Sequence, residues 1–137
     1  MLFKDPLFRL LDGHLDRVAD AARLSLVERV EDYIRGSLPS GACSVERCAN
    51  KLGMPLRTLQ AGLGDERVCF SDILEAQRVE LAKRYLQQPE RSLDEVAALL
   101  GYADQSSFGR AFRRWTGSTP QHYRQSSADR ASRLAQA

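Results

Sequence analysis

One pattern occurs twice in this chain, and it restricts the possible folds more than any other feature. The stretch "SVERCANKLG" begins at Ser44, and "SLDEVAALLG" begins 48 positions later, at Ser92. Each copy opens on serine, a preferred residue before the first turn of a helix, and closes on glycine, which commonly follows the last turn. Between these two residues, apolar or small side chains recur at helical spacing. Each copy therefore predicts a short amphipathic helix that ends in a glycine turn.

A second short helix is predicted after each glycine, over about residues 56–63 and 105–116. Asp104 is a suitable N-cap for the later of the two. Helix, glycine turn and helix form the sequence pattern of a helix-turn-helix, although generic helical hairpins share it. Two copies at a near-constant spacing favour a protein that reads two segments of DNA over one whose helices only pack together.

The other segments also carry helical periodicity, and none alternates with the period of two that indicates a strand. Helices are predicted over about residues 7–19 and 25–37, followed by a Gly-, Pro- and Ser-containing loop at 36–43. The apolar stretch 70–88 predicts a helix of roughly 27 Å, which can hold two small units apart. Successive major-groove segments of DNA recur about every 34 Å. The polar tail, residues 126–137, is predicted to be disordered.

The predicted helix at 105–116 has two distinct faces. Its inward stripe comprises Phe108, Ala111, Phe112 and Trp115. The opposite face carries Ser106, Gly109, Arg110 and Arg113, with Gln105 in the first turn. Gln can pair with adenine and Arg with guanine in the major groove, and a serine at a helix start suits a phosphate. An ordinary solvated face has the same residue types, so this helix alone leaves both interpretations open.

The predicted helix at 56–63 divides in the same way. Its inward residues are Leu56, Leu59 and Leu63, and its outward or flanking residues are Arg57, Thr58, Gln60 and Ala61. Gly62 lies in its interior, where glycine costs about 1 kcal/mol relative to alanine. We therefore expect this helix to be short.

The charge distribution and the cysteine spacing limit the kinds of function that this chain can have. Residues 91–137 hold seven basic and four acidic side chains, a tilt compatible with a polyanionic partner. Cys43, Cys48 and Cys69 form no CxxC pair, which suits reduced thiols in a cytoplasmic protein, and we expect Cys48 and Cys69 to be buried. No apolar run approaches the length of a membrane span, and no signal peptide is evident.

Catalytic motifs are missing from the sequence as well. His14 and His122 are far apart and have no metal-ligand spacing, and no phosphate-cradling glycine motif or nucleophile elbow occurs. We therefore expect no enzyme, no cofactor and no metal site.

The segment "GYADQSSFGRAFRRWTGSTPQHYR", residues 101–124, resembles the C-terminal signature of the AraC/XylS family of bacterial transcription regulators. The matching positions are Gly101, Tyr102, Asp104, Ser106, Phe108, Arg110, Phe112, Arg113, Gly117, Thr119, Pro120, Tyr123 and Arg124. Upstream, "LGMPLRTLQAGL" resembles the first reading helix of that family, and the resemblance covers about residues 25–125.

The resemblance implies an all-α fold of two homeodomain-like helix-turn-helix subdomains, at about residues 25–69 and 91–125, joined by the helix at 70–88. It implies a cytoplasmic regulator, of activator type, that binds promoter or operator DNA, with RNA polymerase as a further partner. By position, it assigns DNA contacts to Arg57, Thr58, Gln60, Ala61, Gln105, Ser106, Gly109, Arg110 and Arg113.

The sequence departs from the family pattern in the first unit. Ala61 stands where the family often has arginine, so it offers at most an apolar contact to a thymine methyl group, and Arg67 stands where the family usually has glycine. Residues 1–24 are too few for the effector-binding or dimerisation domain that family members commonly carry, so we expect a linker or helix there and a C-terminal fragment, or else a free-standing two-unit regulator. The alternative function is a helical protein-interaction module without specific DNA binding.

Overall fold

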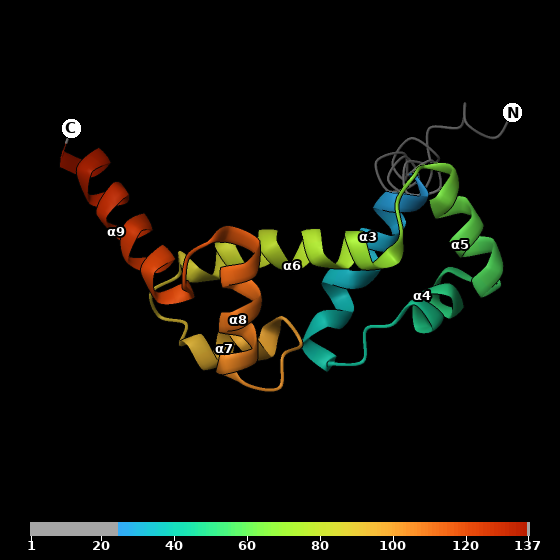
Figure 1. Cartoon of the computed structure of the whole chain (residues 1–137), viewed down its shortest axis with the longest axis horizontal. Coiled ribbons are helices and arrows are strands. Elements are labelled where there is room, and N and C mark those ends of the chain that lie inside the picture. Colours follow the sequence, from blue (N-terminus) through green and yellow to red (C-terminus); the bar gives the residue numbers. More distant parts are fainter. Residues whose placement is uncertain (1–24, 137) are drawn as a thin grey trace, which may run out of the picture.

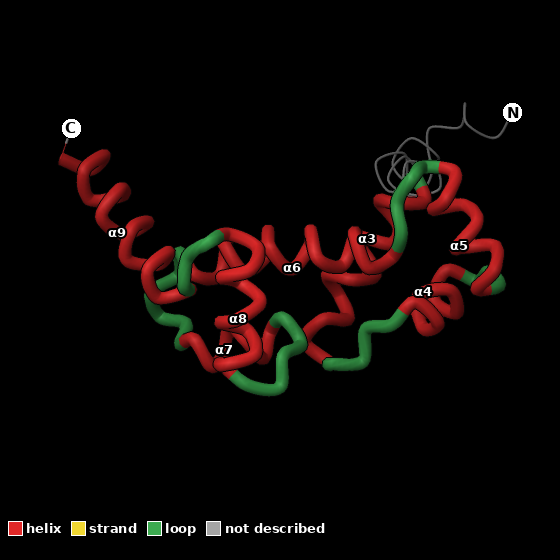
Figure 2. The backbone as a smooth tube through the Cα atoms, viewed as in Figure 1, coloured by secondary structure: helices red, strands yellow, loops and turns green. Residues whose placement is uncertain are grey.

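The computed structural model describes residues 25–136, and the predicted helix at 7–19 and His14 lie outside these described residues. The described elements are α3 (Leu26–Ser37), the 3-10 helix η2 (Leu38–Ser40), α4 (Val45–Leu52), α5 (Leu56–Asp65), α6 (Phe70–Leu86), α7 (Leu93–Leu99), α8 (Gln105–Thr116) and α9 (Pro120–Gln136). Helices and loops account for the whole of this part of the chain, as Figure 2 shows. The prediction of an all-α fold is confirmed.

Helix α6 is the axis of the molecule, with one helix-turn-helix unit toward each of its ends (Figure 1). Helices α3, α4 and α5 form the first unit, and α7, α8 and α9 form the second. Helix α6 packs against α3 of the first unit and against all three helices of the second. Its buried residues are Ile73, Gln77, Leu81, Ala82 and Leu86. The two units therefore share α6 as part of both cores.

Helix starts and ends follow the residues that the repeated pattern predicts. Backbone N–H groups donate to the side chains of Ser25, Ser44, Ser92 and Asp104, at 3.1, 3.1, 3.1 and 2.7 Å. The glycines that close the two copies of the pattern, Gly53 and Gly101, have φ angles of 71° and 85°. Because this left-handed conformation is easily accessible only to glycine, each glycine turns the chain sharply into the next helix.

Helix α5 is longer than expected, since it continues through Gly62 and Gly64 to Asp65. A Cβ atom added to Gly62 would lie 2.5 Å from Cδ2 of Leu26 in α3, so the missing side chain leaves room for that leucine. The packing gained at this contact offsets the helix-weakening effect of glycine. Arg67, which follows α5, has a φ of 60°, the left-handed conformation for which the family uses glycine.

Two residues differ from their predicted environments. Cys69 was expected to be buried but is exposed, because it caps the start of α6, where its N–H donates to the carboxylate of Asp72 at 3.3 Å. Leu38 lies in the segment predicted to be a loop, yet it begins η2 and is 1% exposed. Cys48 is buried as expected, and this burial raises the pKa of its thiol to about 11.

The prediction of a disordered tail is wrong for residues 126–136, because α9 continues to Gln136. No glycine or proline follows Pro120, and Ala, Arg, Gln and Leu are good helix formers. The helix is also fixed at its start, where Tyr123 packs on Phe112 with ring centroids 5.5 Å apart. A helix that tertiary contacts have nucleated extends at little further cost.

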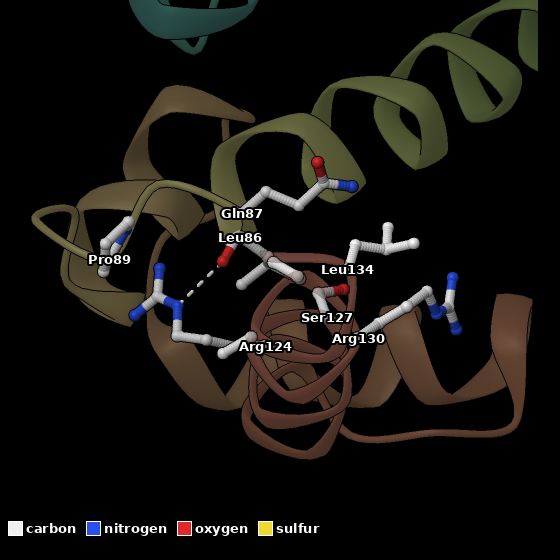
Figure 3. A pocket seen from close by; sticks show the side chains of 9 residues that line it. Leu86, Gln87, Pro89, Arg124, Ser127, Arg130 and Leu134 are labelled. Atoms are coloured by element: carbon white, nitrogen blue, oxygen red, sulfur yellow. Dashed lines mark hydrogen bonds between the residues drawn. The ribbon is translucent and has the colours of Figure 1, made fainter. Parts of the chain in front are cut away.

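Helix α9 also closes the end of α6. Nε of Arg124 donates to the carbonyl oxygen of Leu86 at 2.9 Å, as the dashed line in Figure 3 marks. Beside this contact lies an open cavity of about 500 Å³ between the two helices. Its lining includes Leu86, Pro89, Ala128, Ala131 and Leu134. The side chain of Leu134, at the outer end of this cavity, is 73% exposed.

Candidate nucleic-acid interface

Helix α8 is fixed by an aromatic cluster on its inner face. Phe108 and Phe112 are both 0% exposed, and their ring centroids lie 5.8 Å apart. Tyr102 packs on Phe108 at 5.9 Å, and Trp115 packs on Phe112 at 6.4 Å. The predicted inward stripe is thus confirmed. Such packing fixes the rotation of α8 about its own axis, so the residues of the opposite face have a defined direction.

The outer face of α8 borders a groove of about 460 Å³. Its lining comprises Leu93, Gln105, Ser106, Gly109, Arg110, Arg113, Thr119, Pro120 and Gln121. All five second-unit residues that the sequence assigned to DNA contact lie in this one groove. Gly109 has no atom within 4 Å of the position that a Cβ would occupy, so the helix backbone there is open to close approach.

The charges on this face are left available for a partner. Nη2 of Arg110 donates a hydrogen bond to the neutral Oγ of Ser107, at 3.4 Å. Within residues 25–136, neither Arg110 nor Arg113 takes part in an ion pair. Asp104, at the start of the helix, accepts a hydrogen bond from the N–H of Ser107, which lowers the pKa of its carboxyl group. Two cations therefore line the groove without forming an ion pair in the described chain, although the carboxylate of Asp104 lies near enough to Arg110 to interact with its charge.

The first-unit residues lie on α5, which is separated from α8 along the length of α6 (Figure 1). Arg57, Thr58, Gln60 and Ala61 are all exposed, while Leu59 and Leu63 are 0% and 1% exposed. Gln60 also borders a smaller cavity of about 200 Å³ that extends to Cys69 at the start of α6. The structure therefore groups the predicted residues into two separate sets, one on each short helix.

Sequence reasoning did not include the start of α9 in the interface. Thr119, Pro120 and Gln121 also line the groove, together with the outer residues of α8. Oγ1 of Thr119 accepts a hydrogen bond from the N–H of His122 at 3.1 Å, so it caps this helix. The dipeptide Thr-Pro is itself a helix-start signal. Its place beside α8, however, depends on tertiary packing.

Other kinds of site were also considered for the described residues. None of their helices combines the length and the apolar character that a membrane span needs. Within the same range, His, Cys, Asp and Glu side chains form no group that could hold a metal ion.

A family model described as a helix-turn-helix domain matches residues 48–126, which is more than half of the chain. The transcriptional regulator VirS of Mycobacterium tuberculosis is 46% identical over 100 residues, 73% of this chain and 29% of VirS. The transcriptional activator NphR of Rhodococcus is 33% identical over 110 residues, 80% of this chain and 33% of NphR. The chain thus spans about a third of the length of these relatives.

Solved structures show the same arrangement of helices. A transcriptional dual regulator of Escherichia coli K-12 superimposes with a TM-score of 0.72 at 27% identity, covering 77% of this chain and 95% of that one. The DNA-binding domain of AdpA, solved in complex with a target DNA, gives a TM-score of 0.64 at 28% identity, covering 78% and 96%. Together with the two helix-turn-helix units and the signature over residues 101–124, these similarities show that the chain belongs to the AraC/XylS family of helix-turn-helix transcription regulators.

Proposed function

We propose that this chain binds double-stranded DNA in a sequence-specific way, with α5 and α8 inserted into successive major-groove segments on one face of the duplex. Helix α6, which separates the two, has 17 residues and is therefore roughly 26 Å long. That length is of the same order as the repeat of about 34 Å between major-groove segments. The similarity to the DNA-binding domain of AdpA, which was solved in complex with a target DNA, supports DNA binding by this chain.

The observation that carries the proposal is the groove along the outer face of α8. It combines two unpaired arginines, a glutamine and a backbone that is open at Gly109. A solvated face needs none of these features together, whereas a helix in the major groove needs long donors at the base edges and small residues where it approaches closely.

The roles of individual residues follow from their place on the two helices. In the second unit, we assign base contacts to Gln105, Gly109 and Arg110, and phosphate contacts to Ser106 and Arg113, the latter lying farther along the groove wall. In the first unit, Arg57, Gln60 and Ala61 read bases, while Thr58 lies on the flank and reaches a phosphate. Ala61 is the weakest of these, since it offers only its methyl group.

Selection from a random duplex pool, using this chain, tests the proposal. We expect one enriched sequence with two separate half-sites, bound with an affinity that falls steeply as salt rises, because each phosphate contact releases counterions. Absence of duplex binding at 50 mM salt would refute the proposal and favour a helical protein-interaction module.

The wider role is part of the same proposal. The matched relatives are about three times as long as the matched stretch, which leaves room in such proteins for an effector-binding domain. We infer that the chain acts on promoter DNA in the bacterial cytoplasm, in concert with RNA polymerase, and we assign it no catalytic reaction.

A further inference from the structure

The two helix-turn-helix units touch each other directly, in addition to being joined by α6. Leu38 of η2, in the first unit, is buried against the turn between α7 and α8. A Cβ atom added to Gly101 would lie 3.0 Å from the carbonyl oxygen of Leu38. The two backbones therefore approach so closely at this point that only glycine fits without a shift.

Two consecutive residues in the middle of α6 bind the two units, one each. Gln77, which is 3% exposed, contacts α3 of the first unit, where it accepts from Nη1 of Arg35 at 3.0 Å and donates to Oε2 of Glu31 at 3.2 Å. Arg78 contacts the second unit. Its Nε donates to the carbonyl oxygen of Leu100 at 3.1 Å.

Arg78 also lies over the ring of Tyr102, with Cζ 4.8 Å from the centroid. Cation–aromatic stacking and a charged donor on a backbone carbonyl are both directional contacts. The hydrogen bonds of Gln77 are also costly to break, because its side chain is almost fully buried and few water molecules could replace them. The middle of α6 is thus held to both units through contacts that tolerate little rotation.

We propose that Gln77, Arg78 and the Leu38–Gly101 contact are positioning elements that fix the separation and relative rotation of α5 and α8, so that the chain selects operators by the spacing between their two half-sites. This inference rests on the proposed function. None of the three elements lies on the outer face of α5 or α8, so their effect on DNA passes through the geometry of the two units.

Spacing selectivity follows from the way two linked binding units act together. When the first unit is bound, the second gains a high effective concentration only where the connection places it over its own half-site. One inserted base pair moves that half-site by about 3.4 Å along the duplex and rotates it by about 35°. A flexible connection would follow such a shift, whereas a rigid one would lose most of the second unit's contribution.

The test measures dissociation constants at fixed salt for the selected duplex and for versions with one or two base pairs inserted between the half-sites. We expect one insertion to weaken wild-type binding by about 100-fold, the scale of losing one of two specific units. Arg78→Ala should reduce this discrimination to about tenfold, through the loss of its hydrogen bond and its stacking. Gln77→Leu should act in the same direction.

Matched controls separate positioning from folding and from charge. Arg84→Ala removes an arginine of α6 that pairs only with Glu80 on the same helix, at 3.4 Å, and it should keep the wild-type discrimination. A duplex with a single intact half-site should bind Arg78→Ala and wild type equally well. Arg78→Lys, which can still donate to Leu100, should give an intermediate ratio.

The outcomes distinguish this inference from the proposed function. If wild type binds the selected duplex but tolerates insertions, or if Arg78→Ala discriminates as sharply as wild type, the positioning role is overturned while DNA binding stands. If no duplex is selected, the same geometry is measured without DNA.

The DNA-free measurement uses spin labels at two exposed positions, one at the end of α5 and one within α8. Glu66→Cys and Arg114→Cys carry the labels in a background with Cys43→Ser and Cys69→Ser. A narrow distance distribution that broadens with Arg78→Ala supports the inference. A distribution that is already broad with Arg78 in place overturns it.

Discussion

Gly53 and Gly101 adopt the same left-handed conformation at equivalent points of the two units, with φ of 71° and 85°, but only Gly101 has a neighbour where a side chain would begin. A left-handed residue other than glycine costs about 1–2 kcal/mol. We expect Gly53→Ala to lower the free energy of unfolding by that amount alone. Gly101→Ala should cost about 1–3 kcal/mol more, because its Cβ presses on the Leu38 carbonyl.

Urea denaturation of the two variants and wild type measures this difference. Gly53→Ala serves as the control for backbone strain, since no atom lies within 4 Å of its added Cβ. If both variants lost the same free energy of unfolding, the Leu38–Gly101 contact would accommodate a Cβ atom at no cost.

Arg67 supplies the converse experiment. It is the one residue other than glycine with a positive φ in the described chain, at 60°. Arg67→Gly should raise the free energy of unfolding by up to about 1 kcal/mol, the strain of about 1–2 kcal/mol less the greater freedom of glycine in the unfolded chain. Arg67→Ala keeps the strain and should give no gain, so a stabilised alanine variant would contradict this explanation.

Phe108 packs the inner face of α8 into the core. Because it is 0% exposed and packs on Tyr102 and Phe112, Phe108→Ala should lower the free energy of unfolding by roughly 3–5 kcal/mol. Ser106→Ala, on the exposed face of the same helix, should change it by about 0.5 kcal/mol or less. Thermal melts of the two variants compare them, and a Phe108→Ala variant that melts like wild type would show that α8 is rotated differently.

Arg110 should contribute to specificity more than to folding. Arg110→Ala is expected to weaken binding to the selected duplex by about 1–3 kcal/mol and to relax the preference at one base position. Repeating the duplex selection with the variant measures both effects. An equal loss on all sequences, together with a smaller salt dependence, would instead identify Arg110 as a phosphate contact.

The start of α8 should be sensitive to acid. The hydrogen bond from the N–H of Ser107 lowers the pKa of Asp104 below its ordinary value of 3.8, with a smaller contribution from Arg110. A lowered folded-state pKa means that the carboxylate stabilises the fold above pH 3.8, and that this stabilisation is lost as the pH falls below that value through the folded-state pKa.

Asp104→Asn provides the comparison, because asparagine caps a helix without titrating. Denaturation midpoints at pH 6 and pH 2.5 should show a smaller acid loss for the variant than for wild type. Parallel losses would place the acid-sensitive group elsewhere.

Local signals in the sequence predicted the short helices well. Ser44, Ser92 and Asp104 cap helices as expected, Gly53 and Gly101 end them, and the aromatic stripe of α8 faces inward. These features depend on interactions within about one helical turn, which residue type and spacing encode directly. The DNA contacts assigned to the outer residues stay predictions.

Contacts between distant segments were not predictable in the same way. Leu38 is surrounded in sequence by Gly, Pro and Ser, so composition indicated a loop, but the packing of η2 against α3 and α7 buries it. The prediction of a disordered tail was wrong for a related reason. Its polar composition suggested disorder, but Tyr123 and Arg124 anchor the start of α9 to α8 and α6, and the tail continues that helix.

The sharing of α6 has a consequence for how the molecule can be divided. Counted as separate domains, the two units would overlap by an entire helix, and each would be too small to bury a sufficient core without it. A break in the chain within α6 would remove packing contacts from both helix-turn-helix units. The two units should therefore unfold together in a single cooperative transition on heating or in denaturant. A fragment that contains only one unit should fold only if it includes α6.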